Sequence, residues 1–157
     1  MVTYLKEGNI FNIPGVNNYA HGCNCAGAMG KGIAVQFKEK FPEMYQQYKK
    51  LCKSGAFTLG DVFMYHYGAG TVFNLGTQKS WTTKAELSAV DAAVSKMLQM
   101  ARENQVNQIA LPKVGAGLGG LDWESVKRII DVGAAAYPEI DLFVVENFKE
   151  ALTSKKH

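Results

Sequence analysis

Several features of membrane and secreted proteins are absent from this sequence. No apolar run is close to the length of about 20 residues that a helix needs to cross a bilayer. The first residues show no basic segment followed by an apolar one, as a secretory signal would. The three cysteines, Cys23, Cys25 and Cys52, are an odd number, which favours a reducing compartment over a disulfide framework. We therefore expect a cytoplasmic or nucleocytoplasmic protein without a membrane partner.

Internal repeats, low-complexity linkers and basic stripes are also missing. The chain has 157 residues, 47% of them hydrophobic and 20% charged, which is typical of one globular domain. Lysine and arginine number 17 against 14 acidic residues, an excess too small to indicate a duplex-binding surface. The lysine pairs at 49–50 and 155–156 are interpreted as solvated surface. We expect one monomeric domain over residues 1–157, with a short disordered tail near 153–157.

Strand-like and helical patterns alternate along the chain. The sequence predicts strands at Val2–Leu5, 16–21, 61–67, 71–75, 109–111 and 142–145, and helices at 31–41, 44–54, 85–104 and from about 122 onward. Alternation of this kind is typical of the α/β class, here with a mixed, mostly parallel sheet.

Two glycine-rich connections stand out, each between a strand and a helix. The first glycine loop covers residues 24–32, and the second glycine loop covers residues 114–121. Glycine lets backbone amides approach a ligand closely, and the start of the following helix offers unpaired N–H groups that suit a phosphate. Neither loop has the G-x-x-x-x-G-K-[ST] or G-x-G-x-x-G spacing. The glycines either simply mark loops or form a pair of phosphate sites, and the pair predicts a diphosphate ligand beyond the carboxyl ends of the strands.

These stretches resemble the macro domain family, in particular its ADP-ribose-1″-phosphate phosphatases and terminal ADP-ribose glycohydrolases. The resemblance rests on VTYLK with GNI at residues 2–10, HGCNC with GKGIA at 21–34, and GAGLGGLDW at 115–123, and it covers nearly the whole chain. It implies a three-layer α/β/α fold of about six strands with ADP-ribose in a surface cleft. The diphosphate would lie between the two glycine loops.

The resemblance also implies which residues contact ADP-ribose. Many macro domains have an aspartate after the first strand that accepts a hydrogen bond from adenine, and Asn9 occupies that position here. Phe148 either stacks on adenine or belongs to the core. The full set of implied contacts is Gly8, Asn9, Ile10, Gly27, Met29, Gly30, Gly32, Ile33, Val114, Gly115, Ala116, Gly117, Leu118, Gly119, Gly120, Asn147 and Phe148.

Three residues are candidates for catalysis on the same basis. Asn24 matches the asparagine directed at the distal ribose, and Asp122 and His21 match residues that take part in catalysis in the two branches. From the sequence alone, Asp122 is equally compatible with a helix N-cap, and His21 with a structural hydrogen bond. The resemblance implies a hydrolase that removes the group at C1″ of ADP-ribose, which is a phosphate or an ester- or base-linked group; the alternative is a non-catalytic ADP-ribose reader.

The remaining candidates concern the mechanism and possible cofactors. Some members of the family work through a covalent lysine adduct. Our alignment puts Gln78 at the position of that lysine, and Lys79 follows one residue later. Glutamine cannot form a Schiff base. Cys23 and Cys25 are expected to pack as small apolar groups, because no second cluster of metal ligands follows. Trp81 and Trp123 either line the cleft or anchor helices. We expect no metal or cofactor, and ADP-ribose, ADP-ribose 1″-phosphate or an ADP-ribosylated protein or nucleic acid as the binding partner.

Overall fold

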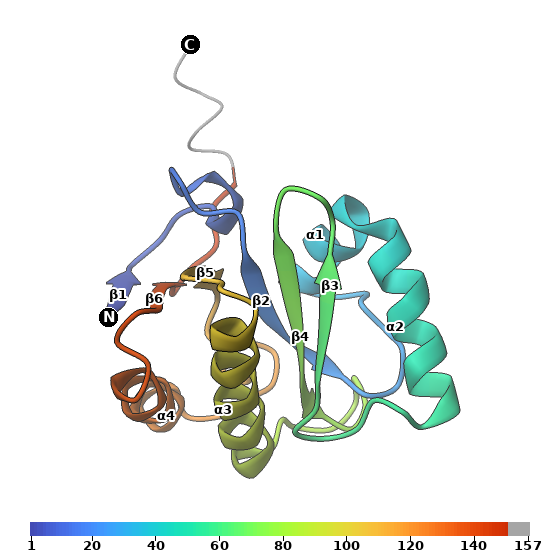
Figure 1. Ribbon diagram of the computed structural model, residues 1–157. Coiled ribbons are helices and arrows are strands. Elements are labelled where there is room, and N and C mark those ends of the chain that lie inside the picture. Colours follow the sequence, from blue (N-terminus) through green and yellow to red (C-terminus); the bar gives the residue numbers. More distant parts are fainter. Residues whose placement is uncertain (151–157) are drawn as a thin grey trace.

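A single six-stranded sheet organises the chain, for which a computed structural model describes residues 1–150 (Figure 1). The tail expected near residues 153–157 lies outside the described part. The strand order is β1-β6-β5-β2-β4-β3. The strands are β1 (Val2–Leu5), β2 (Tyr19–Asn24), β3 (Val62–His66), β4 (Thr71–Gln78), β5 (Gln108–Leu111) and β6 (Asp141–Val145).

Neighbouring strands of the sheet run parallel, except that β3 pairs with β4 as an antiparallel hairpin. The predicted mixed, mostly parallel sheet of about six strands is therefore confirmed. Because β2, β4, β5 and β6 all run in the same direction, the chain segments that follow them meet at one edge of the sheet. That edge brings the two glycine loops together.

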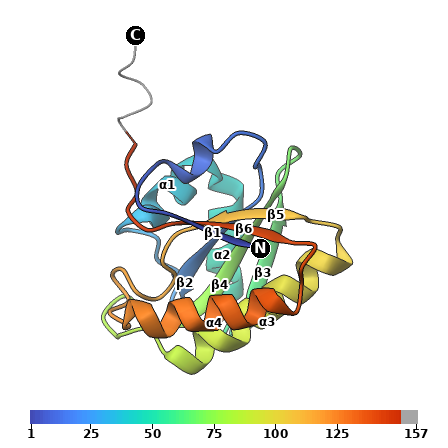
Figure 2. The same cartoon turned by 90° about the vertical axis from the view of Figure 1, so that its left-hand side faces the viewer.

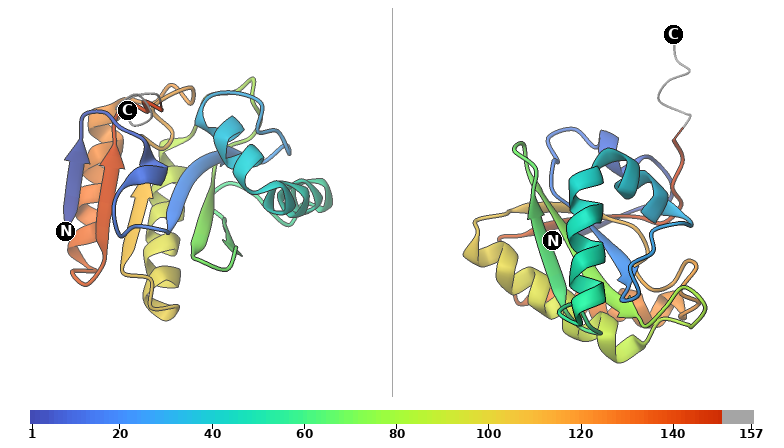
Figure 3. Two further views of the ribbon diagram at one scale, coloured as in Figure 1. Left: turned by 90° about the horizontal axis from the view of Figure 1, so that it is seen from above. Right: turned by 90° about the vertical axis from the view of Figure 1, so that its right-hand side faces the viewer.

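Helices cover both faces of the sheet, which confirms the expected three-layer α/β/α architecture (Figures 2 and 3). One face is covered by α3 (Leu87–Glu103) and α4 (Trp123–Ala135), and the other by α1 (Ile33–Lys40), α2 (Pro42–Ser54) and the short 3₁₀ helix η1 (Ile10–Asn12). Pro42 begins α2 at a position where proline, which lacks an N–H, is tolerated. Within residues 1–150, no helix is long and apolar enough to cross a membrane.

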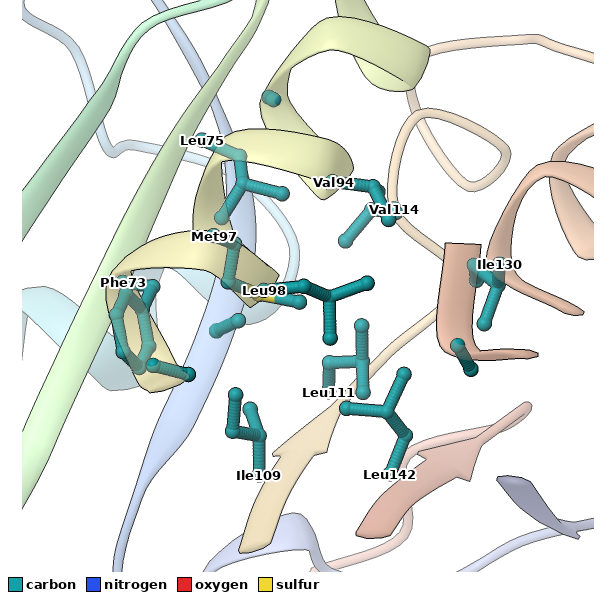
Figure 4. Close-up of a cluster of buried hydrophobic side chains, with 14 of the residues drawn as sticks. Phe73, Leu75, Val94, Met97, Leu98, Ile109, Leu111, Val114, Ile130 and Leu142 are labelled. Atoms are coloured by element: carbon teal, nitrogen blue, oxygen red, sulfur yellow. The ribbon is translucent and has the colours of Figure 1, made fainter. Parts of the chain in front are cut away.

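The core under α3 and α4 is largely aliphatic (Figure 4). Leu98 of α3 and Ile130 of α4 are fully buried in one cluster with Leu111 of β5. In β6, Leu142 and Val144 join this cluster, whereas the alternate residues of the strand contribute to the opposite face, because successive side chains of a strand point to opposite sides.

The core under α1 and α2 is rich in aromatic side chains instead. Phe11 of η1 makes edge contacts with Phe37 of α1 and with Tyr19 of β2, at ring-centroid distances of 5.1 and 5.0 Å. Tyr48 of α2 is fully buried in the same cluster. This layer carries the first glycine loop between β2 and α1.

Two strands differ from their predicted bounds at the end that matters for the site. The strand predicted at 16–21 is displaced and runs through Asn24, and the strand predicted at 71–75 continues to Gln78. The two pair with each other over this extension, up to the contact of Asn24 with Gln78. Pairing between neighbouring strands therefore extends both of them beyond the predicted ends, although glycine has a low strand propensity.

Candidate functional site

A cavity of about 720 Å³ opens at the carboxyl edge of the parallel strands. Its walls come from four connections, those that follow β2, β4, β5 and β6. The residues that line it are Gly22, Cys23, Asn24, Ala28, Met29, Gly30, Lys31, Gly32, Ile33, Ala34, Thr77, Gln78, Trp81, Pro112, Lys113, Val114, Gly115, Gly117, Leu118, Gly119, Val145, Glu146 and Phe148.

The first glycine loop is shaped by Asn24 at the end of β2. The Oδ1 atom of Asn24 accepts hydrogen bonds from the amides of Ala26 (3.0 Å) and Ala28 (3.3 Å), and its Nδ2 atom donates to the carbonyl of Ala28 (2.8 Å). The hydroxyl of Tyr48 on α2 lies 2.7 Å from the carbonyl oxygen of Asn24 and 2.9 Å from its Oδ1 atom. The loop is therefore fixed to the buried face of α2.

The first glycine loop leads into α1 through Gly32, the N-cap residue. Gly32 has φ +62° and ψ −148°, a conformation that favours glycine, and no side chain caps the helix. The backbone N–H groups at the start of α1 are thus left for another acceptor, next to the exposed lysine Lys31. Uncapped amides, the helix dipole and a lysine together suit an anionic group.

The second glycine loop is folded so tightly that it requires glycine at two positions. Gly115 has φ +74°, and its carbonyl accepts a hydrogen bond from the amide of Leu121 (3.0 Å). A Cβ atom on Gly119 would lie 2.5 Å from the carbonyl oxygen of Gly115, closer than any real contact. Gly117, by contrast, faces open space within the cavity. This loop and the first glycine loop face each other across the cavity.

Comparison with known proteins agrees with this geometry. The sequence model of the Macro domain family matches residues 20–130. The chain belongs to the macro domain family. Its sequence is 37% identical over 125 residues to the "DNA ADP-ribosyl glycohydrolase" of Mycobacterium tuberculosis, covering 77% of this chain and 36% of that protein. It is 36% identical over 150 residues to the protein of the same name from Thermus aquaticus, covering 93% of this chain and 41% of that protein.

A solved structure shows the same relationship. The macrodomain of Mycobacterium tuberculosis DarG superposes with a TM-score of 0.86 at 32% identity, covering 96% of this chain and 99% of that chain. The present chain spans about two fifths of the length of the curated relatives above.

The structure brings many of the predicted contact residues of this macro domain into the cavity. From the first glycine loop and the start of α1 these are Met29, Gly30, Gly32 and Ile33; from the second loop they are Val114, Gly115, Gly117, Leu118 and Gly119. Asn24 and Phe148 line it as well. Ala116 and Gly120 are not among the lining residues, and their amides bond within the second loop, to the carbonyls of Lys113 and Gly117.

Gly8, Asn9, Ile10 and Asn147 lie outside the lining of the cavity, and their contact with ADP-ribose stays a prediction. The Oδ1 atom of Asn9 accepts from the amide of Phe11 (2.9 Å) and caps η1, so this oxygen is engaged within the chain. Ile10 is fully buried. The amide of Gly8 donates to the carbonyl of Asn147 (3.0 Å), which joins the segment after β1 to the segment after β6. Gly27 faces a separate hollow against α2.

The structure gives Asp122 a helix-capping role, and its catalytic role stays a prediction. Asp122 is the N-cap residue of α4, and its Oδ2 atom accepts hydrogen bonds from the amide (3.0 Å) and the hydroxyl (2.9 Å) of Ser125. The carboxylate is exposed and does not line the cavity. The helix N-cap that the sequence allowed for Asp122 is therefore observed.

His21 has a buried, structural position, and its catalytic role stays a prediction. Its side chain is fully buried and does not line the cavity. The imidazole stacks on the ring of Phe37, with 3.9 Å between centroids and 9° between planes, and its Nε2 atom lies 2.7 Å from Oδ1 of Asn74. Burial lowers the pKa of His21 to about 4, so the ring is neutral near pH 7. It packs against Phe37 of α1, the helix that follows the first glycine loop.

The cysteines near this loop are thiols, and burial keeps them protonated. Burial raises the pKa of Cys23 well above its usual range and that of Cys25 to about 11. Both are free, and Cys23 packs in the aromatic core as expected. Within residues 1–150, no three His, Cys, Asp or Glu side chains are grouped so that they could hold a metal ion.

Sequence reasoning missed Lys113 and Glu146 and left Gln78 and Trp81 undecided, yet all four line the cavity. Among the described lining residues, Glu146 supplies the one carboxylate, and its Oε2 atom accepts from the indole Nε1 of Trp123 (3.0 Å). Gln78 and Glu146 lie at or next to the ends of β4 and β6. The rule that ligands bind beyond the carboxyl ends of parallel strands was the signal that could have found them.

Gln78, and not Lys79, enters the cavity. The Nε2 atom of Gln78 donates to the carbonyls of Ser80 and Thr83, both at 2.8 Å, while Lys79 is exposed and outside the lining. The described lining therefore has no amine at the position that a lysine adduct would require. Trp81, on the loop that Gln78 holds, is 58% exposed at the rim.

Proposed function

We propose that this macro domain binds ADP-ribose in the cavity and hydrolyses the bond between C1″ of the distal ribose and an attached group. The observation that carries the proposal is the pair of glycine loops that line one cavity, where Gly30 and Gly117 leave open space beside the backbone. Two such loops suit the two phosphates of ADP-ribose. Relatives that contain a similar domain are DNA ADP-ribosyl glycohydrolases, which supports a reaction of this class.

The ligand is oriented in this proposal by the chemistry at the two ends of the cavity. Phe148, half-buried beyond β6, offers an aromatic face for adenine. The diphosphate lies near the uncapped start of α1 and Lys31, whose positive charge it would neutralise. The distal ribose then reaches Asn24 and Gln78, which lie opposite each other at the ends of β2 and β4.

Hydrolysis joins a water oxygen to C1″ and breaks the bond from C1″ to the leaving group. The leaving group departs with the bonding electrons, and the proton lost by the water ends on it. The one carboxylate in the described lining, Glu146, lies at the end of β6, away from Asn24 and Gln78. Catalysis in this proposal therefore rests on orientation of the substrate and exclusion of bulk water rather than on a side-chain base.

A reader that binds ADP-ribose without hydrolysis is the second candidate. The observation that favours it is the position of the two predicted catalytic groups, because Asp122 caps α4 and His21 is enclosed under the sheet edge. Neither touches the cavity. Binding by the glycine loops alone would serve this function equally well.

Turnover separates the two candidates. Purified protein is incubated with ADP-ribose 1″-phosphate, with an ester-linked ADP-ribosylated protein and with ADP-ribosylated DNA, while calorimetry measures ADP-ribose binding. The control is Gly117→Leu, which puts a side chain into the cavity where the backbone has open space. We expect release from at least one substrate, and loss of both release and binding in Gly117→Leu. Binding without release from any substrate would support the reader.

A further inference from the structure

A second hollow, of about 420 Å³, lies beside the first glycine loop on the outer face of α2. The C-terminal half of α2 supplies three exposed lysines to it, Lys49, Lys50 and Lys53, while the loop supplies Ala26 and Gly27. We call this hollow the lysine groove. The loop packs closely on α2, since a Cβ atom on Gly27 would lie 3.9 Å from Cα of Lys49.

The positive charge of the lysine groove is not balanced by nearby acidic groups. None of its lining residues is acidic, and none of its lysines forms an ion pair within residues 1–150. Over residues 31–55 the chain has six lysines and two glutamates. The one aromatic contact in the groove is between Lys49 and the ring of Tyr45, with Nζ 5.2 Å from the ring centroid. An uncompensated basic groove fits a polyanion.

An exposed aromatic side chain, Trp81, lies at the rim of the main cavity. Trp81 is 58% exposed, lines the cavity, and belongs to the loop after β4 that Gln78 holds through two hydrogen bonds. A flat, exposed indole on a fixed loop can stack on any nucleobase, because every base has a π face. The indole thus lies where a group attached to the distal ribose would leave the cavity.

The first glycine loop connects Trp81 to the lysine groove. Asn24 and Ala28 of this loop line the main cavity, whereas Ala26 and Gly27 line the lysine groove, so one short turn separates the two hollows. The amide of Cys25 bonds to the carbonyl of Gln78 (2.8 Å), which brings the loop of Trp81 alongside. The sequence alone shows no cluster of basic and aromatic residues; the fold creates one.

We propose that this surface binds a single nucleic-acid strand that carries the ADP-ribose, with a base stacked on Trp81 and the adjoining phosphates in the lysine groove. The inference rests on the proposed function, since the ADP-ribose held in the main cavity anchors the strand. An ADP-ribosylated protein lacks both the repeated phosphates and the obligatory base, so the combination of a stacking platform with an uncompensated basic groove favours a polynucleotide.

The test compares charge reversals on opposite layers of the molecule. Lys50→Glu/Lys53→Glu alters the lysine groove, and Lys127→Glu/Arg128→Glu alters α4 by the same charge on the other face of the sheet. Fluorescence anisotropy measures binding of an ADP-ribosylated single-stranded oligonucleotide at several salt concentrations, so the readout does not depend on turnover. Calorimetry with free ADP-ribose and binding of an ADP-ribosylated peptide are measured on the same samples.

We expect the groove variant to bind the oligonucleotide at least about tenfold more weakly at low salt. Its plot of log affinity against log salt should be less steep by about 1.4 for two lost phosphate contacts. Trp81→Ala should weaken the same binding about tenfold with the salt slope unchanged, and Trp81→Phe should restore part of it. The α4 variant should behave as the unaltered protein, and the groove variant should bind free ADP-ribose with unchanged affinity, because Lys50 and Lys53 lie outside the lining of the main cavity.

Two outcomes would overturn the inference. One is equal oligonucleotide affinity in the groove variant and the α4 variant. The other is an equal loss for the ADP-ribosylated peptide, which would mean that the groove does not select a polynucleotide. Failure of the unaltered protein to bind free ADP-ribose would instead contradict the proposed function, so the two failures are distinguishable.

Discussion

Acidification should destabilise this protein through His21 well before its carboxyl groups are protonated. The imidazole is fully buried, stacked on Phe37 and hydrogen-bonded to Asn74. Burial lowers the pKa of His21 from its ordinary 6.5 to about 4, because the charged ring would lose its hydration. Between these two values the unfolded chain takes up a proton that the native protein does not. Stability is therefore full above the unfolded pKa and falls as the pH falls below it.

The magnitude follows from this difference in pKa. Each pH unit over which only the unfolded state binds the proton removes about 1.4 kcal/mol from the free energy of unfolding. From pH 7 to pH 5 the loss comes to about 2 kcal/mol, which is a large share of the 5–15 kcal/mol typical of a domain. Carboxyl groups titrate mainly below this range, so the loss belongs to histidine.

Urea unfolding at pH 7, 6 and 5 measures the effect. His21→Gln keeps a donor near Asn74 and removes the titrating group, so its free energy of unfolding should change little over this range. His66→Gln, on β3, is the matched control and should keep the full loss. A loss of about 2 kcal/mol that persists in His21→Gln would refute the assignment, as would a flat pH dependence in the unaltered protein.

Three further substitutions test the site and the core separately. Gly119→Ala should weaken ADP-ribose binding at least tenfold by calorimetry, because the new Cβ atom would meet the carbonyl of Gly115 at 2.5 Å and force the second glycine loop open; unchanged affinity would contradict this. Tyr48→Phe should lower the free energy of unfolding in urea by about 1 kcal/mol and also weaken ADP-ribose binding, because the hydroxyl of Tyr48 holds Asn24. A loss of stability without a loss of binding would show that the first glycine loop keeps its shape without the hydroxyl. Leu98→Ala should lower the free energy of unfolding by about 2–5 kcal/mol and leave the affinity for ADP-ribose at low temperature unchanged. A loss of stability below about 1 kcal/mol would contradict the packing in the aliphatic core.

The fold could be predicted from the sequence because its elements have strong local signals. Apolar residues in short runs mark β1 and β6, and the period of α3 places one face on the sheet, as observed. The ends of β2 and β4 could not be predicted in the same way. Gly22 and Gly76 have weak strand propensity, and only pairing between the two strands extends them to Asn24 and Gln78.

The glycine loops of the site were predictable, but the direction of single side chains was not. Spacing places His21 near the first glycine loop, yet only the registered sheet shows that its ring points toward Phe37 and away from the cavity. Asp122 is likewise close to the second loop in sequence, but its carboxylate is held by Ser125. Glu146 and Lys113 belong to no sequence motif. They are recognised only when the strand ends are aligned.

The two sides of the sheet contribute differently to the site. The face under α3 and α4 supplies an aliphatic core that supports the second glycine loop, whereas the face under α1 and α2 holds the first loop through polar contacts of Asn24 and Tyr48. In the proposed reaction, rate acceleration comes from how accurately the two glycine loops hold the substrate. In that proposal the hydroxyl of Tyr48 bears on turnover because it holds Asn24, and the lysine groove on the same helix would bind the attached strand.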